Sequence, residues 1–134
     1  MMEKLPKDIL LVEDDAANRK LICVVLGDRK RYRIQQADSV EQALELLKNG
    51  TPDLLLLDIR LGNGSGLDLI RAIRANQAFD DVPALAITAQ AMKNDESRFL
   101  AAGFDGYLSK PVDTRRLPEI VARFIREGRK AAYA

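Results

Sequence analysis

The feature that most constrains this chain is an unbroken run of four leucines with an aspartate at each end, residues 53–58. Pro52 precedes the run, and the glycine-rich stretch from Gly62 to Gly66 follows it. A short apolar segment between such breakers predicts a strand buried on both faces, as in a parallel sheet. Asp58 then lies at the carboxyl end of the strand, where open α/β sheets bind their ligands.

Composition excludes several classes of protein. With 134 residues, 47% hydrophobic and 31% charged, the chain has the size and content of one folded domain. A formal net charge of +1 favours neither nucleic acid nor membrane lipid as a partner. The sequence has no histidine, so imidazole catalysis, histidine metal ligands and a phosphohistidine are excluded within this chain.

The sequence also bears on location. Its one cysteine, Cys23, lies in a helical pattern and is expected to be a small core residue rather than half of a disulfide. The first residues lack the apolar region of a signal peptide, and no apolar run nears the ~20 residues that cross a bilayer. We therefore expect a cytoplasmic protein.

Short apolar strands alternate with amphipathic helices along the chain. Beside the central strand, the sequence predicts strands at residues 8–12, 31–37, 84–87 and 106–108. Helices are expected at residues 16–26, from Ser39 to about residue 47, from Gly66 onward, at residues 94–102, and near the C-terminus. Five strands alternating with five helices predict an α/β fold, with a parallel sheet and helices on both faces.

Apolar periodicity assigns a buried face to these helices. Gly103 is expected to stop the helix at residues 94–102, and residues 126–134 are expected to fray. The helix after the central strand is expected to bury Leu67, Ile70 and Ile73, and the last helix Leu117, Ile120, Val121 and Phe124. For the helix at residues 16–26 the cluster of apolar residues suggests a face of Leu21, Cys23, Val24, Val25 and Leu26.

Charged and hydroxyl residues follow four of the expected strands. Because the carboxyl ends of parallel strands share one edge, the residues that converge there are Glu13, Asp14, Asp15, Asp58, Thr88 and Lys110. Two carboxylates 4 Å apart repel by roughly 4 kcal/mol at an effective dielectric near 20, so a cation must balance them. Lys110 can do so in part, and oxygen-only ligands also suit a hard divalent ion such as Mg²⁺.

This set of groups predicts a phosphoryl-transfer site. Asp58 would be the nucleophile that forms an acyl phosphate, while Lys110, the metal and the Thr88 hydroxyl offset phosphoryl charge. Glu13, Asp14 and Asp15 could instead cap the helix that begins near residue 16, and we expect Asp15 to do so.

Four ordered motifs carry a resemblance over nearly the whole chain: Ile-Leu-Leu-Val-Glu-Asp-Asp (9–15), Pro-Asp-Leu-Leu-Leu-Leu-Asp-Ile (52–59), Ala-Ile-Thr-Ala (86–89) and Tyr-Leu-Ser-Lys-Pro (107–111). The chain resembles a response-regulator receiver domain of two-component signalling. The run at residues 88–93 is similar to stand-alone regulators of the cell-cycle type. The resemblance implies a doubly wound, flavodoxin-like sheet of order 2-1-3-4-5, with a receiver domain at 1–127 and a short tail at 128–134.

The resemblance also implies residue roles around a magnesium ion. Asp58 is expected to be the phosphoacceptor. Asp14 and Asp58 are expected to bind Mg²⁺ directly, Glu13 through water, and Arg60 through its backbone carbonyl. The phosphoryl donor would be a histidine kinase or a histidine phosphotransfer protein.

Further expectations concern the response to phosphorylation. Thr88 and Lys110 match the pair that contacts the phosphoryl group, and the Lys110–Pro111 peptide is expected to be cis. Tyr107 matches the switch aromatic, which turns inward as Thr88 moves. A downstream protein target is then expected on the face built by the last two strands and helices.

Three departures from the family pattern stand out. Gly62 takes a place where the family often has proline, so the loop through Gly66 is expected to be looser. Arg60 and Gln90 hold positions that tune dephosphorylation, and we infer no rate from them. Pro118 falls in the first turns of the last helix, where it removes a backbone donor.

Rival functions remain open at this point. A phosphatase of the haloacid dehalogenase type would need a second aspartate two residues after its nucleophile, where this chain has Arg60. A flavodoxin-like nucleotide binder would need neutral backbone donors where this chain has an acidic turn. A receiver-like module that only binds partners, and is never phosphorylated, is the main alternative.

Overall fold

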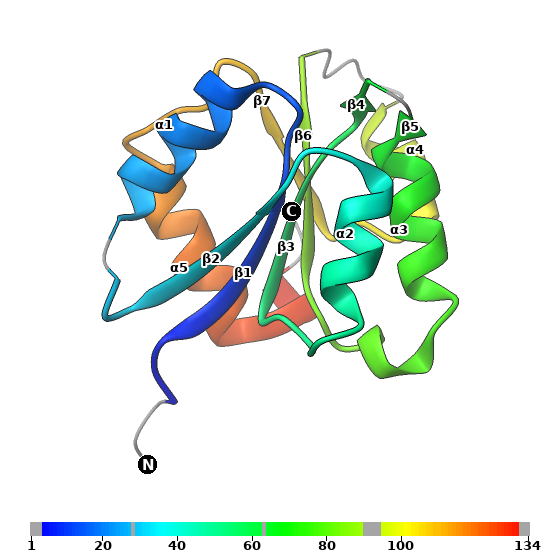
Figure 1. The fold of residues 1–134 in the computed structure, drawn as a ribbon, viewed down its shortest axis with the longest axis horizontal. Coiled ribbons are helices and arrows are strands. Elements are labelled where there is room, and N and C mark those ends of the chain that lie inside the picture. The colour runs from blue at the N-terminus through cyan, green and yellow to red at the C-terminus, as the bar shows by residue number, and fades with distance from the viewer. Residues whose placement is uncertain (1–3, 28, 63, 90–94, 132–134) are drawn as a thin grey trace.

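The computed structural model describes residues 4–27, 29–62, 64–89 and 95–131, and Figure 1 shows its three layers, a central sheet between two layers of helices. Within those ranges no helix combines the length and apolarity required to cross a membrane.

A five-stranded parallel sheet forms the centre of the fold, with strand order β2-β1-β3-β6-β7. Its strands are β1 (Lys7–Val12), β2 (Tyr32–Ala37), β3 (Leu54–Asp58), β6 (Ala84–Thr88) and β7 (Gly106–Ser109). In chain order these are the five expected strands, so the predicted fold class and the order 2-1-3-4-5 are confirmed. Every residue of β3 is buried, as the leucine run predicted.

In the described part of the chain, five α-helices cover the sheet on both faces (Figure 1). They are α1 (Ala16–Leu26), α2 (Val40–Leu47), α3 (Gly66–Arg74), α4 (Asp95–Ala102) and α5 (Leu117–Glu127). Alternate leucines of β3 face opposite sides: Leu54 and Leu56 pack with residues of α1 and α5, and Leu55 and Leu57 with residues of α2, α3 and α4. The four leucines thus join two hydrophobic cores.

The expected apolar face of α1 is wrong in part. The helix buries Ile22 and Leu26, whereas Leu21 and Val24 are 41% and 67% exposed. Successive helical residues rotate by about 100°, so one face cannot bury all of a nearly continuous apolar run. Cys23 is a free, half-buried thiol beside this face.

Local signals at the helix ends agree with the structure. The Ser39 Oγ accepts from the Gln42 amide at 3.1 Å, as a capping residue does. Gly103 follows α4 with φ of 122°, a conformation that favours glycine. Pro118 lies in the first turn of α5, where its missing N–H has no partner within the helix, so the proline leaves α5 intact.

The glycine-rich segment after β3 is more regular than expected. Strands β4 (Arg60–Leu61) and β5 (Gly64–Ser65) form a short antiparallel pair. The Gly66 amide then donates to the Ile59 carbonyl at 2.9 Å, and a Cβ at position 66 would lie 2.2 Å from the Asp58 carbonyl oxygen. Only a glycine lets α3 begin this close to the end of β3.

The expected fraying of the C-terminal segment is wrong for residues 126–131. After α5, the 3₁₀ helix η2 (Gly128–Ala131) packs on the domain and buries Ala131. Arg129 donates to Asp105 at 2.8 Å and to the Asp80 carbonyl at 2.9 Å. Residues 132–134 lie outside the described part of the chain.

Asp105 is the centre of this contact. Its carboxylate also accepts from Arg74 at 3.1 Å and from the Ala84 amide at 2.9 Å. These bonds connect α3, β6 and η2 at the amino ends of the strands, whereas Asp58 lies at the carboxyl end of β3. Sequence periodicity carries no signal for such a polar contact between distant segments.

The first prediction concerns Gly66. We expect Gly66→Ala to lower the free energy of unfolding by about 1–3 kcal/mol, because the new methyl group would overlap the Asp58 carbonyl. Gly50→Ala is the matched control, since nothing lies within 4 Å of a Cβ there. Urea unfolding of both variants measures the difference, and equal midpoints would contradict the close approach.

The second prediction concerns Asp105. Replacing it by alanine leaves Arg74, whose side chain is 12% exposed, without its counter-charge, and should cost about 3 kcal/mol in urea unfolding. Arg129→Met should cost less, because that side chain is more exposed and the inner pair survives. Arg71→Met, which breaks an exposed pair with Asp68, should leave the midpoint unchanged. An unchanged urea midpoint for Asp105→Ala would refute this ranking.

Candidate functional site

The side chains that were predicted to converge at the carboxyl ends of the strands lie there in the structure. Glu13 follows β1, Asp58 ends β3, Thr88 ends β6, and Lys110 follows β7. Glu13, Asp58 and Thr88 are buried, and Lys110 is half-buried. Backbone hydrogen bonds continue just past the strand ends. The Ile59 amide, after β3, donates to the Ile87 carbonyl of β6 at 2.9 Å.

An ammonium group lies between two buried carboxylates. Lys110 Nζ is 2.7 Å from Asp58 Oδ2 and 2.9 Å from Glu13 Oε1. Burial alone would lower the pKa of Lys110, but its hydrogen bond to Asp58 and the nearby negative charges of Asp58 and Glu13 raise that pKa on balance. Lys110 therefore stays protonated here.

Asp58 is held from two sides. Its Oδ2 accepts from Lys110, and its Oδ1 accepts from the backbone amide of Arg60 at 3.0 Å. Only 2% of the residue is exposed, yet it lines a surface cavity. The carboxylate is thus fixed in orientation and open on one side.

Glu13 is the least satisfied group of the site. Its carboxylate is fully buried, and neither oxygen has a hydrogen bond of acceptable geometry among the described residues, although Lys110 is close. Burial first, and the neighbouring Asp58 second, raise the pKa of Glu13 to about 7, against a smaller opposing effect of Lys110. A buried carboxylate without donors is costly unless a cation binds it.

The acidic turn is fixed by the start of α1. Asp15 caps the helix, as expected, by accepting from the amides of Ala17 and Asn18 at 2.8 and 3.3 Å. Arg19 Nη1 donates to the carbonyl oxygens of Glu13 and Asp14, at 2.7 and 3.2 Å. Arg19 is not among the residues predicted for the site; the signal for it in the sequence is a cation one turn into the helix that follows the acidic turn.

The carboxylates fit a hard divalent cation. One oxygen each from Glu13, Asp14 and Asp58 lies within 4.8 Å of the others, and Asp14 is exposed. The ligands on offer are all carboxylate oxygens, which suits Mg²⁺ rather than a softer metal. Among the described residues, neither oxygen of Glu13 has a hydrogen-bond partner, so both are available to a cation. Arg60 lines the same cavity and contributes its amide to Asp58, as described above.

A cavity of about 470 Å³ opens over these groups. Asp58, Thr88 and Lys110 line it, and so do Asp95 and Arg98 from the start of α4. The guanidinium of Arg98 lies 3.3 Å from Asp95. Neither residue was anticipated, because both reach the edge from a helix rather than from a strand end. Gln90 lies outside the described residues.

Tyr107 of β7 packs against α4, three residues before Lys110. It belongs to β7, is half-buried, and packs with its ring centroid 6.1 Å from that of Phe99 in α4. The peptide between Lys110 and Pro111 is cis, as expected.

Comparisons with known proteins agree with this geometry. A family model described as the response regulator receiver domain matches residues 9–122. The polar-differentiation response regulator DivK of Brucella anthropi is 33% identical over 121 residues, which are 90% of this chain and 98% of that protein.

Solved structures give the same fold. A CheY-like receiver domain protein from Methanospirillum hungatei has a TM-score of 0.80 at 27% identity, with 90% of this chain and 94% of that chain covered. The Mn(2+)-bound form of response regulator Rcp1 has a TM-score of 0.79 at 22% identity, with 91% and 96% covered, and shows the fold alone. The chain belongs to the response-regulator receiver domain family.

Proposed function

We propose that Asp58 accepts a phosphoryl group from a phosphohistidine donor in a Mg²⁺-dependent reaction, and that phosphorylation switches the binding of a partner protein. The observation that carries the proposal is the position of Lys110 Nζ, 2.7 Å from Asp58 Oδ2 and beside a cluster of three carboxylates. A cation already paired with the acceptor is what an incoming phosphoryl group requires.

The residues that would hold the metal are Glu13, Asp14 and Asp58, with the Arg60 carbonyl as a further ligand. Support comes from the oxygen-only donor set and from the Glu13 carboxylate without hydrogen bonds. A relative of the same fold, Rcp1, has been solved in a Mn(2+)-bound form. When bound, the ion would supply positive charge next to the phosphoryl oxygens.

The protein groups have separate parts in the transfer. A carboxylate oxygen of Asp58 attacks phosphorus, the phosphorus–nitrogen bond of the donor breaks, and the released imidazole takes its proton from solvent. The Lys110 ammonium pairs with phosphoryl oxygens, and the Thr88 hydroxyl donates to them. The acyl phosphate forms on the chain itself, so the protein acts as a signalling phosphoacceptor and not as an enzyme on other substrates.

The change in partner binding would arise from the contact between Tyr107 and Phe99. A move of Thr88 toward the phosphoryl group frees space for the Tyr107 ring, and rotation of that ring breaks its contact with Phe99. The face of α4, β7 and α5 then changes shape for a downstream target. The donor would be a histidine kinase or a histidine phosphotransfer protein, and a cytoplasmic location stays a prediction from the sequence.

The third prediction tests the acceptor. Incubation with acetyl phosphate and Mg²⁺ should add the mass of one phosphoryl group, stable in acid and lost in base, as an acyl phosphate is. Asp58→Asn should remove this gain. Asp53→Asn is the matched control, just before the other end of β3, where the carboxylate accepts from the Asp8 amide at 2.8 Å. Equal labelling of Asp58→Asn would exclude this acceptor, and no labelling of the unchanged protein would favour a module that only binds.

The fourth prediction tests the metal. Mg²⁺ at a hundredfold excess over its dissociation constant should raise the free energy of unfolding by about 2.7 kcal/mol, and EDTA should reverse this. Asp14→Asn should lose most of the gain, while the metal-free variant should be at least as stable as the parent, because one repelling charge is removed.

The control for the metal is Asp68→Asn on α3, which lies outside the carboxylate cluster and should keep the full response to Mg²⁺. Thermal unfolding with and without Mg²⁺ measures all three proteins. An unchanged response in Asp14→Asn would remove this residue from the site.

A further inference from the structure

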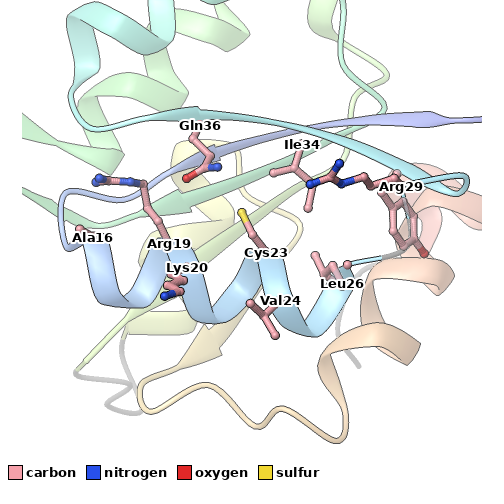
Figure 2. Close-up of a pocket in the computed structure, with 11 residues that line it drawn as sticks. Ala16, Arg19, Lys20, Cys23, Val24, Leu26, Arg29, Ile34 and Gln36 are labelled. Atoms are coloured by element: carbon pink, nitrogen blue, oxygen red, sulfur yellow. The ribbon is translucent and has the colours of Figure 1, made fainter.

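A groove runs between α1 and the edge strand β2, and it is separate from the cavity above Asp58. Its volume is about 640 Å³, within the range of ligand-binding clefts. Figure 2 shows Cys23 pointing from α1 toward β2, with Ile34 and Gln36 opposite. From α1 the groove is lined by small, charged and apolar side chains, among them Ala16, Arg19 and Leu26.

The position of β2 leaves this groove open. The strand pairs with β1 alone among the described strands, so it is an edge of the sheet. The residues that face α1 are alternate ones, including Ile34 and Gln36, while Arg33 and Gln35 line a hollow beside α2 instead. Half-buried apolar groups and an open strand edge therefore lie side by side.

Among the described residues, the charged side chains that line the groove are all cationic. Its charged lining residues are Arg19, Lys20 and Arg29, and no acidic side chain of the described residues lines it. Figure 2 places Arg19 near one end and Arg29 near the other, with Lys20 between them on α1. Among the described residues neither Lys20 nor Arg29 forms an ion pair. Three cationic side chains thus line one cleft of a chain whose formal net charge is only +1.

We propose that this groove docks a short acidic segment of a partner protein. Carboxylates of the segment would pair with Lys20 and Arg29 at the rim, and its apolar side chains would cover Cys23, Ile34 and the exposed Val24. The mixture of apolar floor and cationic rim favours a peptide over nucleic acid, whose backbone has no apolar side chains to bury. The interaction does not require phosphorylation of Asp58.

The fifth prediction tests this docking with a defined probe. The probe is a peptide of alternating glutamate and leucine with as many residues as β2, so that an extended chain presents one acidic and one apolar face. Titrated into the ¹⁵N-labelled protein, it should shift the amide resonances of Cys23, Ile34 and Gln36 most. The affinity should fall as salt is added.

Charge reversal supplies the matched control. Lys20→Glu with Arg29→Glu should weaken binding about tenfold, by loss and reversal of two charge pairs. Lys48→Glu with Arg71→Glu makes the same change in net charge on α2 and α3 and should leave the affinity within about twofold.

Three results would overturn the proposal. They are an absence of shifts in the groove at millimolar peptide, equal weakening by both double variants, and tighter binding of a thymidine oligonucleotide of equal length at the same residues. The last result would assign the groove to nucleic acid instead.

Discussion

Two buried carboxylates share one ammonium group at the edge of the sheet, and the rest of the site is arranged around that balance. Removing Glu13 and Asp58 from water is costly, and Lys110 offsets only part of the cost. The pKa of Glu13 is raised because part of the cost of burying its charge is not offset by Lys110. The fold holds this unfavourable cluster in place because β3 joins two cores, so the strand that ends in Asp58 cannot shift. Stability elsewhere in the molecule thus maintains a local excess of negative charge that a cation can use.

Much of this could be predicted from the sequence because it depends on short-range patterns. Strand and helix periods identify five strands and five helices, and the shared edge of parallel strands brings Glu13, Asp58 and Lys110 together without any knowledge of side-chain positions. Asp15 was identified as a cap for the same reason, since capping is decided within one turn of helix.

The remainder could not be predicted, because it depends on which way long side chains turn. Arg19 and Arg98 reach the site from helices, and only packing decides their direction. The contact of Arg129 with Asp105 spans 24 residues of sequence and has no periodic signal, which is why the C-terminal segment was expected to fray. The buried face of α1 could not be predicted because its apolar residues are almost continuous, so their spacing does not indicate which side of the helix faces the core.

Arg19 takes part in two regions at once. Its guanidinium holds the carbonyl oxygens of Glu13 and Asp14, and its side chain also lines the groove beside β2. A molecule in the groove that drew this guanidinium away would remove both of its bonds to the acidic turn. Coupling free energies are reciprocal, so if a molecule in the groove changed the affinity of the acidic turn for a cation, the cation would change the affinity of the groove for that molecule by the same factor. A single side chain, that of Arg19, therefore connects the groove beside β2 with the acidic turn.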